Sequence, residues 1–305
     1  MRTDFYYPSH GAGQIHGCRW MPEGQPKGIL QIVHGIAEFV ERYDEFANFL
    51  AAGGFMVVAE DHMGHGQSIG PECPKGYFAG GWFTAVEDTM QLMRDTMAQF
   101  PGLPYILFGH SMGSFMARTI LAKYPDSGIA GAIICGTGWQ PRAALPLLSP
   151  VINSICKKHG ETTPVPALHK MIFGGYNKRI ENPKTPNDWL TRDEQIVADY
   201  NAHPLCGFVP ACGLLRDMMN GIYYIEQPKH LANMKKHLPV LFIAGREDPV
   251  GPYGKGVEQA ANAFRSAGMV NVTTKLYADC RHEILNELNR QEVYGDILHW
   301  LQQVL

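Results

Sequence analysis

The residues around Ser111 have the spacing that a nucleophilic serine requires. Gly109, Ser111 and Gly113 form the pattern G-x-S-x-G; the apolar run Tyr105–Phe108 leads into it and the helix-forming run Met112–Lys123 follows. A sharp turn between strand and helix exposes the serine oxygen, and glycine removes Cβ atoms where the two elements crowd together. In a chain with 33 glycines the pattern could arise by chance. The flanking strand and helix argue against chance, and we interpret Ser111 as a nucleophile.

A serine hydroxyl becomes reactive only when a base takes its proton. His282 is the best candidate among 13 histidines, because it stands between the last apolar run, Val272–Tyr277, and the final helical segment. In open α/β sheets, sites lie beyond the carboxyl ends of the strands. The turns that carry Ser111 and His282 can therefore meet there.

The preceding strand-like run, Val240–Ala244, ends in a turn with two acidic residues, Glu247 and Asp248. Either carboxylate could orient the imidazole. We prefer Asp248, because it precedes Pro249 and its shorter side chain suits a tight turn.

Acyl transfer also requires backbone N–H groups that stabilise an oxyanion. One donor should be the N–H of Met112, directly after the nucleophile. The second should come from the loop after Ile29–Val33, where Gly35 allows close approach and Ile36 follows it. We therefore predict an oxyanion hole made by Ile36 and Met112.

The rest of the chain supplies the elements that would position these residues. Apolar runs of strand length alternate with segments of helical periodicity, which predicts a mostly parallel, doubly wound sheet of the α/β class. Residues 1–20 should add an antiparallel hairpin, with strands at Phe5–Tyr7 and Gln14–Trp20. The predicted parallel strands are Ile29–Val33, Phe55–Ala59, Tyr105–Phe108, Ala132–Cys135, Val240–Ala244 and Val272–Tyr277. The predicted helices are Tyr43–Ala52, Thr84–Gln99, Met112–Lys123, Lys255–Ala267 and Ile284–Leu305.

The alternation stops once, between residues 139 and 231, and ninety residues without a strand are too many for a plain loop. We predict a core formed by residues 1–138 and 232–305, and a helical cap formed by residues 139–231. This cap should select the substrate and leave the chemistry to the core. Its short helices are predicted at Pro146–Lys158, Ala167–Phe173, Asp193–Tyr200 and Leu214–Ile225. Its bulky side chains would line an acyl channel or form the core of the cap; they include Met171, Phe173, Trp189, Met218, Met219, Tyr223 and Tyr224.

Composition excludes several other classes of protein. The net charge is −3 with no basic run, so we expect no nucleic-acid partner. No apolar stretch is long enough for a signal peptide or a membrane span. Seven cysteines without CxxC spacing indicate buried thiols in a reducing compartment, and we expect a cytoplasmic protein. Asp61, His62 and His65 could suggest a metal site, but they follow a strand as a loop motif, and we expect neither metal nor cofactor.

Five motifs in order are HGIAEFVERY, DHMGHGQS, GHSMGS, GREDPV and RHEILNE. Together they resemble the monoacylglycerol lipase and lysophospholipase branch of the α/β-hydrolases over nearly all of the core, and the likeness fades across the cap. The resemblance implies the triad Ser111, Asp248 and His282, and the oxyanion-hole residues Ile36 and Met112. It also implies that Arg42 and His110 help to hold a glycerol end and that Glu38 fixes the oxyanion loop. Ile36 is bulkier than the small residue common at its position, which would narrow the alcohol pocket.

The resemblance implies a serine ester hydrolase with an apolar acyl chain and a small polar alcohol in its substrate. Monoacylglycerols, lysophospholipids and short synthetic esters fit that description, and the cap could touch a membrane surface transiently. The triad does not separate esters from amides, so an aminopeptidase or amidase is the alternative enzyme. A receptor that retains the triad to hold a small molecule is the alternative from another class.

Overall fold

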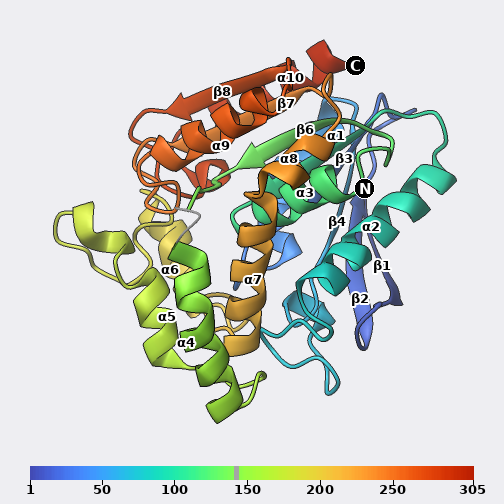
Figure 1. The fold of residues 1–305 in the computed structure, drawn as a ribbon. Coiled ribbons are helices and arrows are strands. Elements are labelled where there is room, and N and C mark those ends of the chain that lie inside the picture. The colour runs from blue at the N-terminus through green and yellow to red at the C-terminus, as the bar shows by residue number, and fades with distance from the viewer. Residues whose placement is uncertain (141–143) are drawn as a thin grey trace.

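An eight-stranded sheet organises the computed structural model, which describes residues 1–140 and 144–305 (Figure 1). The strand order is β1-β2-β4-β3-β5-β6-β7-β8. Only the pairings β1 with β2 and β2 with β4 are antiparallel. The strands are β1 (Arg2–Pro8), β2 (Gln14–Trp20), β3 (Ile29–Val33), β4 (Met56–Glu60), β5 (Tyr105–His110), β6 (Ile129–Cys135), β7 (Val240–Gly245) and β8 (Val272–Tyr277).

All predicted strands are present, and the fold class is confirmed. The sequence located β2, β3 and β8 to the residue, whereas β6 begins three residues earlier than predicted. Strands β3 to β7 are buried along their whole length except at Ala130, as expected for strands covered on both faces.

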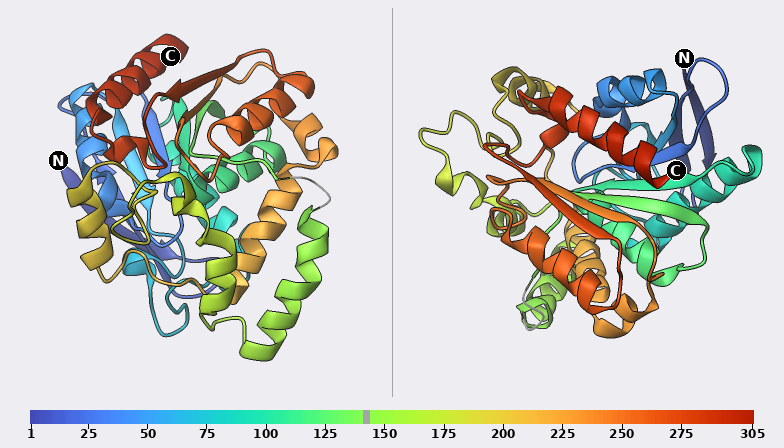
Figure 2. Two further views of the ribbon diagram at one scale, coloured as in Figure 1. Left: turned by 90° about the vertical axis from the view of Figure 1, so that its left-hand side faces the viewer. Right: turned by 90° about the horizontal axis from the view of Figure 1, so that it is seen from above.

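Two layers of helices cover the sheet, and Figure 2 shows them on opposite faces. One layer holds α1 (Asp44–Ala52) and α10 (Arg290–Val304), and the other holds α2 (Trp82–Gln99), α3 (Met112–Lys123) and α9 (Lys255–Ser266). Val86, Met90 and Met93 of α2 recur at spacings of four and three residues and are buried, so they form one apolar stripe. Each face of the sheet therefore has its own apolar core.

Helices fill the described chain between β6 and β7, as the sequence predicts for residues 139–231. Figure 1 shows α4, α5 and α6 beyond the end of the sheet to which the arrows of β6 and β8 point. Helix α7 packs against α2 and α3, so it shares the core of one sheet face. The helices are α4 (Ala144–His159), α5 (Pro166–Phe173), α6 (Glu194–Ala202), α7 (Cys212–Ile225) and α8 (Pro228–Asn233). Helix α8 crosses the predicted domain boundary at residue 231.

The single helix predicted at Ile284–Leu305 is wrong. A short 3-10 turn at Ile284–Asn286 precedes α10, and the two are separated at Glu287. The buried Glu287 carboxylate accepts backbone N–H groups from Arg281 and Leu288 and pairs with Arg192. Four N–H donors thus converge on this carboxylate where the helix is interrupted, and helical periodicity does not reveal it.

The seven cysteines are buried and form no disulfide, as expected for thiols that serve as small apolar residues. Within residues 1–140 and 144–305, no helix combines the length and apolar character needed to cross a bilayer.

Candidate active site

Ser111 occupies a strained turn between β5 and α3. Its φ of 53° lies in the left-handed region, which is costly for a residue with a Cβ. A Cβ on Gly113 would lie 1.9 Å from the carbonyl oxygen of Val33, so only glycine fits there. The backbone N–H of Ser111 donates to the carbonyl of Cys135 at 3.0 Å. The turn is therefore fastened to β6 and presents the serine at the end of the sheet.

Asp248 and His282 meet as predicted. His282 Nδ1 lies 3.0 Å from both carboxylate oxygens of Asp248, and both residues are buried. The N–H of Val250 donates to Asp248 at 2.8 Å and fixes the carboxylate on its turn. Glu247 is exposed instead, so the geometry favours Asp248 as the partner of the histidine.

The loop that carries His282 is also held from the inserted helical segment. The N–H of Glu283 donates to the carbonyl of Leu190 at 2.7 Å, and that of His282 donates to Trp189 at 3.4 Å. The Trp189 ring lies 5.0 Å from the imidazole of His282, centroid to centroid. The insertion therefore helps to position the histidine.

The predicted oxyanion loop passes directly beside Ser111. A Cβ on Gly35 would lie 3.1 Å from the Cβ of Ser111, which shows how closely the backbone approaches. Ile36 and Met112 both line the cavity that Ser111 faces. Met112 begins α3, where a helix has no internal acceptor for its first N–H groups. Both proposed donors therefore lie beside Ser111: Met112 at the start of α3, and Ile36 in the loop that passes the serine.

Glu38 anchors that loop. Its Oε1 accepts the N–H of Gly35 at 2.6 Å and the hydroxyl of Tyr43 at 2.9 Å, and lies 3.1 Å from Nδ1 of His110. Nε2 of His110 is buried at the cavity and has no hydrogen-bond partner among the described residues. Glu38 therefore ties the oxyanion loop to the residue just before Ser111, and His110 retains one ring nitrogen for a ligand.

Arg42 does not line the cavity, which argues against the direct glycerol contact expected from the resemblance. Its guanidinium donates to Glu38 at 2.8 Å and, through two nitrogens, to Glu283 at 2.6 Å. The side chain is only 11% exposed and lies over the ring of Tyr200. Arg42 joins the oxyanion loop to the loop that carries His282.

Pairing of opposite charges offsets the effect of burial on the pKa values in this cluster. Burial alone would raise the pKa of Glu38, but His110 and Arg42 outweigh burial and lower it. Burial likewise opposes the charged form of His110, yet the hydrogen bond and charge of Glu38 raise its pKa. Arg42 lowers the pKa of Glu283 against the effect of burial. Opposite charges therefore counter the effect of burial at each of these three groups.

A cavity of about 670 Å³ joins these residues to the insertion. Its apolar wall comes from α3, α4, α5 and α7, and Met171, Phe173, Trp189, Met218 and Met219 line it, among the residues suggested from the sequence. Tyr223 and Tyr224 do not line it: Tyr223 is 42% exposed, and Tyr224 packs on Phe83 and His230. Of the two roles left open for such side chains, lining the channel applies to neither tyrosine, and Tyr224 instead packs against the apolar core.

The Asp61, His62 and His65 motif bonds to backbone in and near the oxyanion loop. Asp61 accepts the N–H of Val40 at 2.8 Å, while ring nitrogens of His62 and His65 bond to backbone carbonyl oxygens. The three side chains therefore bond to different backbone groups.

Comparison with known proteins agrees with this geometry. Residues 24–289 match the family described as serine aminopeptidase, S33. The chain belongs to this family of α/β-hydrolases. It is 28% identical to a monoacylglycerol lipase of Mycolicibacterium smegmatis, over 98% of this chain and 97% of the relative. It is 28% identical to human monoglyceride lipase, over 95% and 88%. A thermostable carboxyl esterase of Bacillus coagulans, solved with glycerol, is 32% identical and superposes with a TM-score of 0.92 over 99% and 98%. These relatives support an ester hydrolase of the lipase type.

Two residues that the sequence analysis missed complete the arrangement. Glu283 stands directly after His282, and Tyr200 of α6 donates to the carbonyl of Ala37 at 3.0 Å. The position of Glu283 beside the histidine was a usable signal. Tyr200 had none, because its partner lies 163 residues away in the chain.

Proposed function

We propose that this protein is a serine carboxylic-ester hydrolase that forms an acyl-enzyme on esters of an apolar acyl chain and a small polyol, with monoacylglycerols as the natural class. The observation that carries the proposal is one cavity that contains Ser111, His282, a polar end at His110 and a long apolar wall. The relatives named monoacylglycerol lipase, and the esterase solved with glycerol, add support.

In the first half of the reaction, Ser111 Oγ attacks the ester carbonyl while Nε2 of His282 takes its proton. Asp248 holds the imidazole in the tautomer that leaves Nε2 as the acceptor. The N–H groups of Ile36 and Met112 receive the oxyanion. His282 then protonates the leaving alcohol, and the acyl group stays on Ser111.

Water completes the reaction. His282 removes a proton from the water as it attacks the acyl carbon, and returns that proton to Ser111 as the bond to the acid breaks. Arg42, Glu38 and Glu283 do no bond chemistry; they keep the oxyanion loop and the histidine loop in register.

The alcohol should lie at the polar end of the cavity. Nε2 of His110 is buried there with no hydrogen-bond partner among the described residues, and a hydroxyl of the leaving polyol would satisfy it. Ile36 narrows this end, which favours a small alcohol over a bulky headgroup. The aminopeptidase alternative is weaker, because an aminopeptidase needs a free carboxylate to bind the charged amino group of its substrate. Both carboxylates that line the cavity, Glu38 and Glu283, are already paired with Arg42.

The acyl chain should lie along the apolar wall. Each buried methylene contributes about 0.8 kcal/mol, so four of them would favour a longer chain by roughly two orders of magnitude. Leu147 and Val151 of α4 and Met171 of α5 are exposed at 76%, 50% and 54%. Such side chains support the expectation that the insertion touches a lipid surface.

The decisive experiment combines a substrate panel with a covalent probe. Glycerol monoesters and nitrophenyl esters of increasing chain length are compared with aminoacyl-naphthylamides, and Ser111→Ala is the control. We expect turnover of the esters, a preference for the longer glycerol esters, and a fluorophosphonate adduct on Ser111 alone. Faster turnover of the amides would replace the proposal with the aminopeptidase. Ester binding without turnover would replace it with the receptor.

A further inference from the structure

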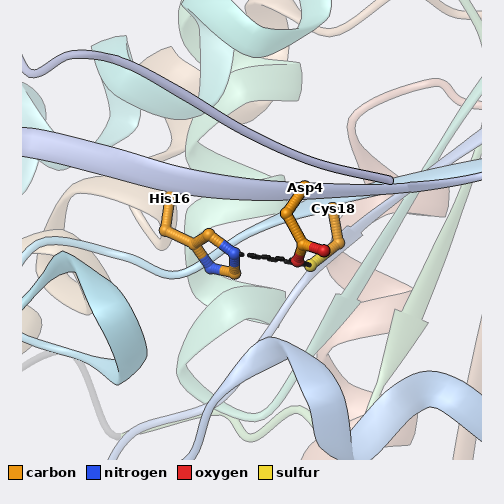
Figure 3. A group of neighbouring side chains, drawn as sticks. All are labelled: Asp4, His16 and Cys18. Atoms are coloured by element: carbon orange, nitrogen blue, oxygen red, sulfur yellow. Dashed lines mark hydrogen bonds and ion pairs between the residues drawn. The ribbon is translucent and has the colours of Figure 1, made fainter. Parts of the chain in front are cut away.

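A second group of reactive side chains lies in the N-terminal hairpin, away from the cavity. Figure 3 shows Asp4 of β1 and His16 and Cys18 of β2 with their side chains turned toward one another. Asp4 Oδ1 lies 3.0 Å from His16 Nε2 and 3.1 Å from Cys18 Sγ, and the sulfur lies 3.8 Å from the same nitrogen. None of the three lines the active-site cavity. The proposed reaction therefore leaves this group without a role.

The register of the hairpin brings the three together. Asp4 and Cys18 are paired across the antiparallel strands, and His16 is two residues from Cys18, so both project from the same face of β2. His16 and Cys18 are fully buried, whereas the Asp4 side chain is 47% exposed. The candidate ligand atoms of His16 and Cys18 are thus rigidly held. The Asp4 carboxylate lies on an edge strand, where it can move.

These distances are close to those of a tetrahedral zinc site. Bonds of about 2.0–2.3 Å from zinc to nitrogen, oxygen and sulfur place neighbouring ligand atoms about 3.3–3.6 Å apart. The three observed separations each differ from that spacing by a few tenths of an ångström. A small outward movement of the Asp4 carboxylate would open the space for an ion.

A carboxylate behind the histidine is an independent sign of a metal ligand. Nδ1 of His16 lies 2.8 Å from Asp61 Oδ2, and both side chains are fully buried. The same Asp61 oxygen accepts the N–H of Gln67 at 2.9 Å, which fixes it. Histidines that bind metals usually direct their other ring nitrogen to such a partner, which orients the ring.

Arg2 is the cation that competes for Asp4. Its guanidinium donates to Asp4 at 2.9 Å, but also to Glu41 at 2.7 Å and to Asp44 at 3.0 Å. The last two carboxylates can hold Arg2 when Asp4 turns to an ion. Competition by Arg2 therefore weakens binding without preventing it.

We propose that Asp4, His16 and Cys18 bind a thiophilic divalent cation, Zn²⁺ or Co²⁺, with water as the fourth ligand. A thiolate and an imidazole select such ions over Mg²⁺ and Ca²⁺, which prefer oxygen ligands. On binding, the Cys18 thiol loses its proton and the sulfur forms a bond to the metal. His16 binds as neutral imidazole through Nε2, and any proton there is released to solvent. The ion would fasten β1 to β2, so its role is structural and separate from ester hydrolysis.

The test titrates the full, tag-free, chelator-treated chain with Co²⁺ and then with Zn²⁺. We expect one ion per chain, a thiolate-to-cobalt charge-transfer band, loss of that band on adding Zn²⁺, and a rise in melting temperature with Zn²⁺. Cys18→Ser should abolish the band and weaken binding at least tenfold, although its hydroxyl can still donate to Asp4. Cys73→Ala is the matched control, because Cys73 is about as buried as Cys18 but lies outside β1 and β2, and its loss should leave binding unchanged.

Asp61→Asn tests the carboxylate that orients His16 separately from the three metal ligands. It should weaken binding by about 10- to 100-fold, while the thiolate band remains at saturating Co²⁺. No binding by the folded wild-type chain would overturn the proposal. An unchanged band in Cys18→Ser would also overturn it, because another residue would then supply the sulfur.

Discussion

The ends of the core strands and the inserted helices contribute to the same cavity in different ways. Ser111, Asp248 and His282 stand on the turns that follow β5, β7 and β8. Backbone hydrogen bonds to β6 and from Val250 hold the first two, at 3.0 and 2.8 Å. The insertion contributes side chains from several helices, and of these Met171 is 54% exposed. Under the proposed function, chemistry would depend on a few tightly held groups, and selection on a broad apolar wall.

The division is not complete, because the insertion also holds the loops that carry the proposed oxyanion donor and the proposed base. Tyr200 and Gly207 both donate to the carbonyl of Ala37 in the oxyanion loop, at 3.0 and 2.9 Å. Leu190 accepts the N–H of Glu283 beside the base. The insertion therefore reaches both sides of Ser111, which modifies the expectation that it acts on substrate choice alone. The predictions below separate its two roles.

Removal of a triad residue should have the largest effect. Asp248→Asn and His282→Ala should each lower kcat by about three to four orders of magnitude, because the base is lost or wrongly oriented. Glu247→Gln is the matched control, since its exposed side chain should be nearly silent. Steady-state kinetics on one ester, with circular dichroism to verify folding, measures this. A crippled Glu247→Gln with an active Asp248→Asn would reverse the choice of acid.

The turns that carry the triad could be predicted because each follows a buried strand within a few residues. Contacts between residues far apart in the sequence could not be predicted. The pairing of Arg42 with Glu283 spans 241 residues, and only the folded chain brings the two side chains together. In α7 the helical spacing was visible in the sequence, but not which face meets the cavity. Met218 and Ile222 line it, whereas Tyr223 projects elsewhere.

Polar substitutions in the apolar wall should affect long substrates selectively. Phe173→Asn combined with Met218→Gln should lower kcat/KM for long-chain esters by up to roughly two orders of magnitude, because burial of several methylenes is lost. Acetate esters should change little. Tyr223→Gln is the control, since that residue does not line the cavity. Equal losses on all chain lengths would place the acyl chain elsewhere or give these residues a role in the catalytic loops.

Breaking the ion pair between the loops should lower the rate regardless of chain length. Arg42→Met leaves Glu38 and Glu283 buried without their cation, and we expect a loss of about 3–5 kcal/mol in unfolding free energy. Misplacement of the loops should lower kcat by between tenfold and about a hundredfold with little change in KM. Leu301→Ala, a buried residue of α10, provides a variant of similar stability loss far from the site. If Leu301→Ala slowed kcat equally, general destabilisation would explain the result.

Acid should weaken the core beneath the oxyanion loop through its neutral histidines. Burial lowers the pKa of His65 from 6.5 to about 4. The folded state therefore binds this proton less readily than the unfolded state, and stability falls as the pH drops from 6.5 toward 4. At one pH unit below 6.5, His65 alone should lower the free energy of unfolding by about 1.4 kcal/mol, which is tenfold in the unfolding equilibrium. Denaturant unfolding of wild type and His65→Gln measures this, and equal acid sensitivity in both would contradict it.

The smallest effect should come from the contact between the insertion and the oxyanion loop. Tyr200→Phe removes one hydrogen bond to Ala37 and keeps the ring beneath Arg42, while the Gly207 N–H still donates to the same carbonyl. A net loss of about 1 kcal/mol corresponds to roughly a fivefold lower kcat. Because the oxyanion forms on every substrate, the decrease should be the same for acetate and long-chain esters. A decrease confined to long chains would show that Tyr200 acts on the acyl group, and the insertion would then select substrates without supporting the chemistry through this contact.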